Sequence, residues 1–255
     1  MNQINKHQDF EKVNSEFEEA KRDIYTDCAS NKAWTKFTPI HKNISYNRCP
    51  ICEQKLDMEN ERHTGSSIDH FRPKRNLANS KLPKDAYAFL ECEENNYILM
   101  CKGCNDGYKE SFFPLDNDFV AKSIDDLVLE YPLLINPREE DPLDYFELVF
   151  TTKYLPLAIL ELKRKQDLGK GSYSYRKAEK TILFFGLGKC HKLEIEKNDN
   201  NLCRVITLNE HYEALYDLAK AIQEEKDFSE LLEDNPKLIE YGFFRFLIEG
   251  QFRID

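Results

Sequence analysis

The sequence lacks the features of a membrane or secreted protein. It has no apolar run of about 18 residues, which is the length of a membrane-spanning helix. Its opening stretch, MNQINKHQDFEKVNSEFEEAKRD, contains nothing that resembles the apolar part of a signal peptide. Internal repeats and low-complexity segments are also missing. We therefore expect a cytoplasmic, globular protein that does not associate with membranes.

Positive charge is scarce as well. Lys and Arg number 36 against 46 Asp and Glu, which gives a formal net charge of −10. Between residues 49 and 115, nine Lys and Arg stand against eleven Asp and Glu. Affinity for phosphate depends on clustered Lys and Arg, so this balance argues against a free-standing, non-specific nucleic-acid binder. A nucleic-acid substrate has to be held locally or presented by a partner.

What the sequence does have is eight cysteines in two groups. Four are scattered, and in a reducing compartment we expect them to be ordinary thiols without structural disulfides; they are Cys28, Cys92, Cys190 and Cys203. The others form two Cys-x-x-Cys pairs, CPIC and CKGC, and each such turn can direct two sulfurs at one zinc ion. Two thiol pairs without metal, or one redox pair, are the alternatives, but neither pair lies in the βαβ pattern that a redox pair would need. We predict a structural Zn²⁺ held by Cys49, Cys52, Cys101 and Cys104.

Candidate catalytic residues lie within and just after this zinc segment. Asp69 and His70 are adjacent in SSIDHFRPK, Asn96 precedes the apolar run YILM, and Asn105 and Lys109 follow the second cysteine pair. An Asp-His pair by itself is more often a surface pair or a local hydrogen bond. Here, however, two oxygen donors for Mg²⁺ or Mn²⁺ accompany a histidine that can take a proton from water. Positions 105 and 109 also share a helix face, which puts a cation near a bound phosphate. The set predicts phosphodiester hydrolysis with one divalent ion.

These residues resemble the HNH nucleases, whose active site is a ββα-metal fold and which in many cases carry two Cys-x-x-Cys knuckles around zinc. The matching segments are IDHFRPK and NYILMCKGCN. The resemblance implies that His70 is the general base, that Asp69 is a metal ligand, and that Asn96 fixes the loop orienting the histidine. Asn105 stands where the family has His or Asn as the second metal ligand. Lys109 stands where the family has a His or a basic residue.

The similarity reaches beyond this motif. SIDHFRPK, the segment from NYILMCKGCN to FPL, and LLINPREEDPLDYF resemble the HNH nucleases of bacterial Septu-type anti-phage systems (PtuB-like), including retron-associated ones, over about residues 49 to 147. The resemblance implies a hetero-oligomeric complex with an ABC-type ATPase (PtuA-like) that cleaves nucleic acid, with DNA the first expectation and RNA the alternative. It also places Arg72 and Lys74 where they could contact phosphate.

The expected fold is α+β. An N-terminal helical segment (1–46, with a helix over 9–30) precedes a zinc-stabilised ββα nuclease core (47–115), and a mostly α-helical, partner-docking region follows (116–255). Within the core we expect a strand at YILM and a short helix from Cys104 to about Ser111. Pro39 should prevent a helix between Trp34 and Tyr46. Further expectations are a structured loop at LLINPREEDPLDYF, a strand in FELVFTTKYLP, and helices over 158–168, 173–186, 207–226 and 236–252, the third opening with a capping box at Thr207 to Glu210.

Two other functions stay open. A non-catalytic zinc adaptor that binds a partner protein through its helical C-terminal half needs only the cysteines. A nuclease acting alone is disfavoured by the acidity and by the lack of a separate DNA-binding motif. We expect the acidic runs at 91–94 and 224–234 to be solvated, and the aromatic cluster at 241–252 to be core or interface rather than a base-stacking platform. The histidines expected at the surface or in local hydrogen bonds are His41, His63, His191 and His211.

Overall fold

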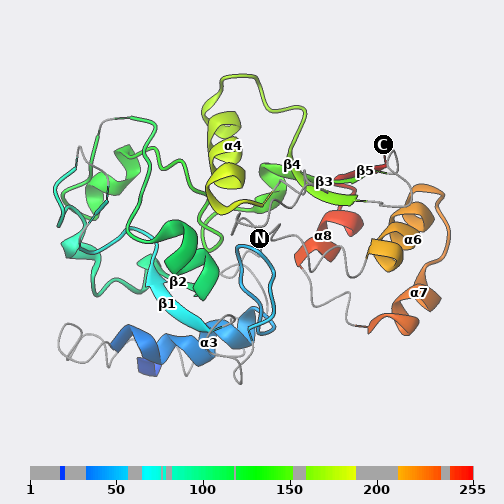
Figure 1. Ribbon diagram of the computed structural model, residues 1–255, viewed down its shortest axis with the longest axis horizontal. Helices are drawn as coiled ribbons and strands as arrows, with labels where there is room; N and C mark the ends of the chain where they lie inside the picture. The colour runs from blue at the N-terminus through cyan, green and yellow to red at the C-terminus, as the bar shows by residue number, and fades with distance from the viewer. Residues whose placement is uncertain are drawn as a thin grey trace, which may run out of the picture. The chain divides into compact units, whose positions relative to one another are not determined.

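The computed structural model describes residues 18–20, 33–56, 65–75, 77–78, 82–117, 119–151, 159–187, 212–236 and 242–254. The chain divides into an N-terminal unit that ends at Glu140 and a C-terminal unit that begins at Asp141 (Figure 1). Both units mix helices with a small sheet, so the α+β expectation is confirmed. Among the helices described, none has the length and apolar character needed to cross a bilayer.

Two antiparallel strands form the centre of the N-terminal unit. β1 (Ser66–His70) pairs with β2 (Tyr97–Cys101) in a register that runs from Ser66 opposite Cys101 to His70 opposite Tyr97. Every residue of β2 is buried, as its sequence YILMC favours. The predicted strand is therefore confirmed, and its two ends lead to the two halves of the candidate site.

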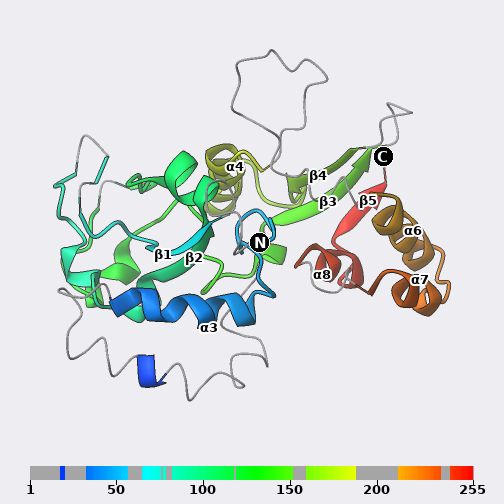
Figure 2. The ribbon, with the colours of Figure 1, turned by 60° about the horizontal axis from the view of Figure 1, so that its bottom comes forward.

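A helix at the start of this unit packs against both strands (Figure 2). It comprises the 3-10 turn η1 (Ala33–Lys36) and α3 (Phe37–Ile44). The residues that α3 buries are Phe37, Ile40, His41 and Ile44, the spacing of an amphipathic helix. The expectation that Pro39 prevents a helix is wrong. Pro39 is the third residue of α3, where the missing N–H has no intrahelical acceptor in any case.

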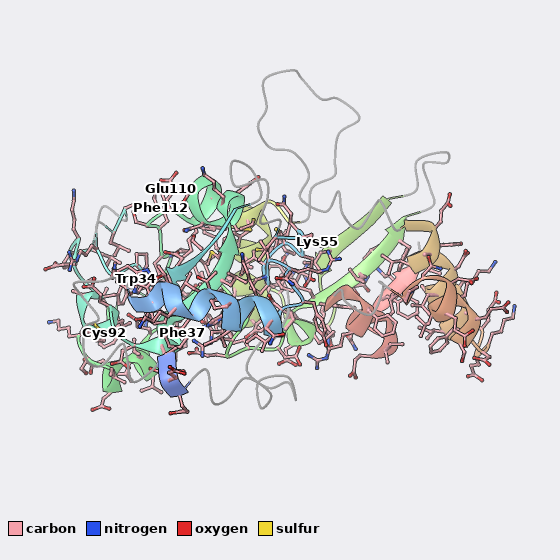
Figure 3. The ribbon with its side chains drawn as sticks, turned by 90° about the horizontal axis from the view of Figure 1, so that it is seen from below. Trp34, Phe37, Lys55, Cys92, Glu110 and Phe112 are labelled. Carbon is pink, nitrogen blue, oxygen red and sulfur yellow. The ribbon has the colours of Figure 1, made fainter. Side chains whose placement is uncertain are left out.

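The helix η4 (Gly103–Lys109) follows β2 directly and is a wide π-helix. The predicted short helix after the second cysteine pair is thus confirmed. It ends at Glu110, whose φ of 45° breaks the helical path, and Figure 3 places Glu110 and Phe112 just beyond it. The remaining elements of this unit are 3-10 turns: η2 (Ala88–Leu90), η3 (Glu94–Asn96) and η5 (Asp125–Leu129). Of the predicted helix over 9–30, only Glu18–Ala20 are described, and they are helical.

The C-terminal unit is built on a three-stranded sheet of order β4-β3-β5. β3 (Phe146–Thr151) pairs antiparallel with β4 (Ile159–Arg164) and parallel with β5 (Phe252–Ile254). A 3-10 turn, η6 (Pro142–Asp144), leads into β3. The helices are α4 (Tyr173–Phe185), α6 (Tyr212–Gln223), α7 (Ser229–Asp234) and α8 (Gly242–Ile248).

Several predictions for this unit are confirmed. The strand in FELVFTTKYLP is β3, and LLINPREEDPLDYF is a loop with one 3-10 turn. α4 matches the helix over 173–186. The side chain of Ser172 caps its start, and Gly186 ends it in the left-handed conformation. α6 lies within 207–226, although the capping box predicted at its start falls outside the described residues. Phe246 in the aromatic cluster is buried, which agrees with a core role.

Other predictions are wrong. The segment 158–168 contains the strand β4 rather than a helix, because its pairing with β3 outweighs the helix propensity of Leu, Glu, Lys and Arg. Leu162 on this strand is buried. In 236–252 the described helix is limited to α8, and Phe252 already belongs to β5. In the part that the structure describes, the C-terminal region therefore contains less helix than expected.

Candidate metal centre and catalytic cluster

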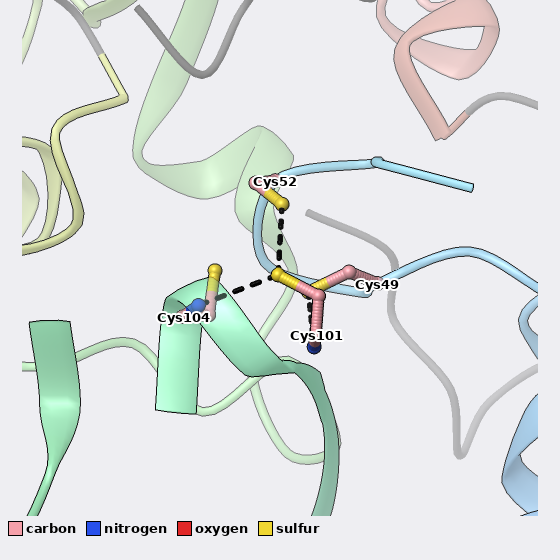
Figure 4. Close-up of side chains that lie close together, drawn as sticks. All are labelled: Cys49, Cys52, Cys101 and Cys104. Atoms are coloured by element: carbon pink, nitrogen blue, oxygen red, sulfur yellow. Dashed lines mark hydrogen bonds between the residues drawn. The ribbon is translucent and has the colours of Figure 1, made fainter. Parts of the chain in front are cut away.

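Four cysteine thiols meet at one end of the β1–β2 pair (Figure 4). Cys49 and Cys52 lie on a tight turn in which the Cys49 carbonyl accepts from the Glu53 N–H over 2.8 Å, and an isolated bridge pairs Arg48 with Lys55 beside it. Cys101 ends β2, and Cys104 lies in η4. All four side chains are buried, and their Sγ atoms lie within 4.8 Å of one another. The predicted set of four is confirmed as a cluster.

The geometry of this cluster fits a tetrahedral zinc ion. The Sγ atoms of Cys52 and Cys101 are 3.7 Å apart, and Zn–S bonds of about 2.3 Å give a tetrahedron with edges of about 3.8 Å. The Cys101 N–H donates to the Cys49 sulfur over 3.4 Å, and the Cys104 N–H donates to the Cys101 sulfur over 3.3 Å. Hydrogen bonds from Cys104 and Cys49 hold the pKa of Cys101 far below its usual range, while burial raises the pKa of Cys104. A divalent cation bound by these four residues would supply the positive charge that lets all four be thiolates.

One of the scattered cysteines differs from expectation. Cys92, labelled in Figure 3, is disulfide-bonded, although we expected the scattered cysteines to be free thiols. Sequence spacing does not reveal which distant cysteines approach to the Cα separation of about 4.4–6.8 Å that a disulfide needs. Cys28, Cys190 and Cys203 lie outside the described residues.

The strand β1 presents two different faces. Because side chains alternate along a strand, Ser67 and Asp69 share one face. Along it lies η4: the Asn105 Nδ2 donates to the Ser67 Oγ over 3.0 Å, and the Lys109 Nζ donates to the Asp69 Oδ2 over 2.6 Å. The Lys109 side chain is fully buried, whereas that of Asp69 is 22% exposed. Lys109 is therefore the internal counter-ion of Asp69.

His70 belongs to the opposite face of β1. Its Nε2 lies 2.9 Å from the Glu91 carbonyl oxygen. A carbonyl can only accept, so Nε2 carries the hydrogen and Nδ1 of the neutral ring keeps its lone pair. Trp34 and Tyr97 meet the ring edge-on, with centroids 5.3 and 5.1 Å away. Burial lowers the pKa of His70 below 6.5, although the Glu91 bond opposes this, so the ring is neutral at pH 7.

Asn96 clamps the turn that follows His70. Its Oδ1 accepts from the Arg72 N–H over 2.8 Å, and its Nδ2 donates to the Arg72 carbonyl over 2.9 Å. The Phe71 N–H also donates to the Asn96 carbonyl over 2.7 Å. A buried side chain with both ends bonded to one backbone segment fixes the path of the chain beside the imidazole.

The two residues predicted to contact phosphate are both engaged with carboxylates. The Arg72 Nε donates to the Glu130 Oε2 over 2.8 Å, and its guanidinium lies 5.3 Å from the Phe113 ring centroid. The Lys74 Nζ donates to the Glu91 Oε1 over 2.9 Å and sits 3.3 Å from the centroid of the Trp34 ring. Lys74 is partly exposed and Arg72 is nearly buried.

Sequence reasoning missed the acidic residues that organise this cluster. Glu91 and Glu94 are buried, so the expectation of a solvated acidic run at 91–94 is wrong for these two. The Glu91 carboxylate binds Lys74 and Arg75, and these bonds lower its pKa even though burial acts to raise it. Glu130 lies 58 positions from its partner Arg72. Separations of this size leave no local signal in a sequence.

The donors predicted for a catalytic divalent ion are not assembled into a cage. Among the described residues, the four cysteines are the one group of three or more His, Cys, Asp or Glu side chains close enough to share an ion. Asp69 already accepts from Lys109 through Oδ2, and the amide of Asn105 is bonded to Ser67. An ion at Asp69 would have to displace the ammonium or use the other carboxylate oxygen. Because Mg²⁺ usually keeps several waters and takes few protein ligands, a site with Asp69 and Asn105 as its two protein ligands stays a prediction.

Two further polar side chains of the N-terminal unit are buried. Arg138, from LLINPREEDPLDYF, donates to the carbonyls of Glu94 and Tyr97, and burial lowers its pKa to about 10. His41 is fully buried, and in the described part of the chain neither of its ring nitrogens has a hydrogen-bond partner. The expectation of a surface or hydrogen-bonded His41 is therefore wrong. The other three histidines of that group lie outside the described residues.

A comparison with known proteins agrees with the resemblance that the sequence motifs indicate. Over 171 residues, which are 66% of this chain, the sequence is 29% identical to the Septu protein PtuB of Bacillus mycoides (strain KBAB4). The aligned part covers 50% of that protein, so the chain spans about half the length of the curated relative it matches. No family model matches, and no solved structure matches. The chain is thus PtuB-like in sequence over about two thirds of its length.

Proposed function

We propose that this protein is a metal-dependent HNH endonuclease that hydrolyses nucleic-acid phosphodiester bonds. One observation carries the catalytic part of the proposal. At the end of a strand whose partner strand is anchored by the cysteine cluster, the Nε2 of His70 is tied to the Glu91 carbonyl. That bond leaves Nδ1 as a proton acceptor on the residue that directly follows Asp69 in β1.

The order of elements supports this proposal. β1 and β2 are antiparallel, and a short helix follows at once, which is the succession that the HNH resemblance implies. Cys101 and Cys104 hold the point where strand passes into helix. From there η4 reaches Asp69 through Lys109. The cysteine cluster thereby supports the start of η4 directly and β1 through its pairing with β2.

In the proposed reaction His70 takes a proton from the attacking water through Nδ1. The imidazolium that results keeps its Nε2–H bond to the Glu91 carbonyl, and a bond to a charged donor is stronger than one to a neutral donor. Asn96 holds the backbone after His70 and so limits rotation of the base. Trp34 packs edge-on against the ring and also limits its movement.

The proposed cofactor is Mg²⁺ or Mn²⁺, with Asp69 and Asn105 as protein ligands. When bound, such an ion neutralises negative charge on the phosphate and on the leaving oxygen. Because Asp69 is paired with Lys109 in this arrangement, the ion must compete with the ammonium for the carboxylate. Lys74, which is partly exposed, is the better candidate of the two proposed phosphate contacts, since Arg72 is held by Glu130.

We also propose the setting in which the nuclease acts. Similarity to the Septu protein PtuB supports a role as the nuclease effector of an anti-phage defence complex, with an ABC-type, PtuA-like ATPase as its partner in the cytoplasm. The net charge of −10 supports the same view, because an acidic nuclease needs a partner to bring it to nucleic acid. DNA is the proposed substrate, and RNA is the alternative.

A non-catalytic zinc adaptor is the second candidate. The observation that favours it is that the charged side chains at the site already have protein partners: Asp69 with Lys109 and Arg72 with Glu130. An adaptor requires only that these pairs hold the fold together. The two functions differ in whether His70 matters beyond stability.

A cleavage assay separates these functions. Wild type, His70→Ala and His41→Leu are purified with zinc contents verified, and each is incubated with DNA or RNA and Mg²⁺ or Mn²⁺, with and without the ATPase. We expect cutting that depends on the divalent ion and falls about 100-fold or more in His70→Ala. His41→Leu is the matched control: it removes another buried imidazole and should cut normally.

Two outcomes contradict the proposal. If His70→Ala cuts as fast as wild type, His70 is not the base. If zinc-loaded wild type cuts neither nucleic acid with the ATPase bound, the zinc adaptor becomes the better account.

A further inference from the structure

The residues between Leu115 and Pro132, which pair as an isolated antiparallel bridge, form a closed loop that we call the 116–131 loop. Its ends are fastened together: the Asp116 N–H donates to the Tyr131 carbonyl over 2.8 Å, and the Asn117 Nδ2 donates to the Leu129 carbonyl over 3.1 Å. Position 118 lies outside the described residues. A loop braced in this way presents the side chains at its tip in a defined arrangement.

The tip of this loop is apolar and exposed. No residue of η5 (Asp125–Leu129) is buried, and Val128 is 82% exposed. Single exposed apolar side chains are ordinary on a protein surface, whereas a group of them on one short segment indicates an interaction site. The exposed apolar residues of the loop are Phe119, Ile124, Val128, Leu129 and Tyr131.

Charge decides what kind of molecule this surface fits. Within 116–131, apart from the buried Glu130, four Asp stand against one basic residue, Lys122. Such a surface repels phosphate, so a nucleic acid does not fit it. Apolar side chains with charged neighbours are typical of protein interfaces, where the partner carries charge of the opposite sign. The matching surface is an apolar pocket bordered by Lys and Arg.

The inner side of the loop connects to the candidate site through Glu130. Its Oε1 accepts from the Ala121 N–H over 2.8 Å, and its Oε2 accepts from the Arg72 Nε over 2.8 Å. Both Glu130 and Ala121 are buried. Arg72 comes two positions after His70, and Asn96 holds its backbone. One carboxylate therefore joins the loop to the turn beside the proposed base.

We propose that the 116–131 loop is the docking surface for a protein partner with an apolar pocket bordered by basic side chains, and that Glu130 transmits docking to Arg72 beside the candidate site. Identifying this partner as the PtuA-like ATPase rests on the proposed function. The surface itself follows from exposure and charge alone.

Binding of the purified PtuA-like ATPase to the zinc-loaded chain, measured by calorimetry, tests the docking surface. Val128→Asp places a charge at the most exposed apolar position, and we expect the dissociation constant to rise about tenfold or more. Leu183→Asp is the matched control, because Leu183 is 60% exposed on α4 in the other unit; its binding should stay within about twofold of wild type. Asp125→Asn combined with Asp126→Asn should slow association. Zinc content and melting temperature verify the fold of each variant.

Several results overturn the docking proposal: Val128→Asp binds the ATPase as wild type does, wild type forms no complex with it, or Val128→Asp alters the binding of a DNA or RNA oligonucleotide instead. The outcomes also separate this proposal from the nuclease. A chain that binds the ATPase through Val128 but cuts nothing loses the nuclease and keeps the docking surface. A chain that cuts, while Val128→Asp binds normally, loses only the docking surface.

Hydrogen exchange tests the transmission step. We expect docking to slow deuterium uptake in residues 71–75 of wild type. At ATPase concentrations that saturate the chain, the change in 71–75 should be lost in Glu130→Gln, because the bond between the loop and Arg72 is weakened. If docking leaves exchange in 71–75 of wild type unchanged, the transmission part of the proposal is wrong.

Discussion

Replacing Asp69 and replacing Lys109 should destabilise the protein by different amounts, although both changes break the same ion pair. Asp69→Asn removes the negative charge that balances a fully buried ammonium and leaves it only neutral acceptors, such as the Glu110 carbonyl at 3.4 Å. Removing one partner of a buried ion pair costs about 3–5 kcal/mol, and we expect this variant to fall in that range. Lys109→Met leaves a carboxylate that is 22% exposed. Because water can reach that charge, we expect a smaller loss of about 1–3 kcal/mol.

Urea unfolding of the zinc-loaded variants measures this asymmetry. The double variant, Asp69→Asn with Lys109→Met, has no buried charge at this position and should be more stable than Asp69→Asn alone. The four proteins form a double-mutant cycle whose interaction energy belongs to the pair.

The reasoning is refuted if Asp69→Asn unfolds within about 0.5 kcal/mol of wild type, or if Lys109→Met is the costlier change. A large loss in Asp69→Asn has a practical consequence for the nuclease proposal. Reduced cutting by that variant would then reflect lost structure as much as a lost metal ligand. For that reason the decisive comparison is made at His70.

Other parts of the N-terminal unit give further predictions. Chelating the zinc, or changing Cys101→Ser, should abolish the cooperative unfolding of this unit. Trp34 is the single tryptophan of the chain, so its fluorescence reports the transition. A melting curve that stays unchanged would contradict the zinc site. Asn96→Ala removes both side-chain bonds to the Arg72 backbone and should lower the free energy of unfolding by about 1–3 kcal/mol, measured by thermal denaturation. No change in stability would mean that the turn after His70 keeps its conformation without these two bonds. Burial, with a contribution from Arg138, holds the pKa of His41 in the folded protein well below the ordinary 6.5. The unfolded chain therefore takes up a proton at this residue first as the pH falls, so the contribution of His41 to stability should be constant above pH 6.5 and decrease below it. His41→Leu should flatten the decrease between pH 6.5 and 5, and chemical denaturation across this range gives the slopes.

The parts of the fold that the sequence predicts correctly are those with local signals. The strand β2 is a short apolar run, and α4 has a serine cap and a terminating glycine. The Cys-x-x-Cys spacing identifies the four residues that cluster. The strand β4 has no such signal, because its residues favour a helix until β3 pairs with them. The expectation from Pro39 was wrong because the effect of a proline on a helix depends on its position within the helix.

The candidate site shows the same division. The sequence singles out Asp69, His70 and Asn96 as residues with a possible shared role. It does not show that Lys109 is the partner of Asp69, or that Glu130 binds Arg72, because these contacts form only when distant segments fold together. The His41 side chain carries no mark of burial in the sequence either. Spacing identifies the residues, and tertiary structure decides their partners.

The oxygen that orients His70 belongs to the main chain of Glu91 rather than to its side chain. Any amino acid at this position offers the same carbonyl, so replacing Glu91 tests its hold on Lys74 and Arg75 and leaves the imidazole's acceptor in place. A substitution screen would therefore report position 91 as a charge partner and overlook its second role. What must be preserved for that role is the path of the turn, and a chain with a different residue at 91 can preserve it fully.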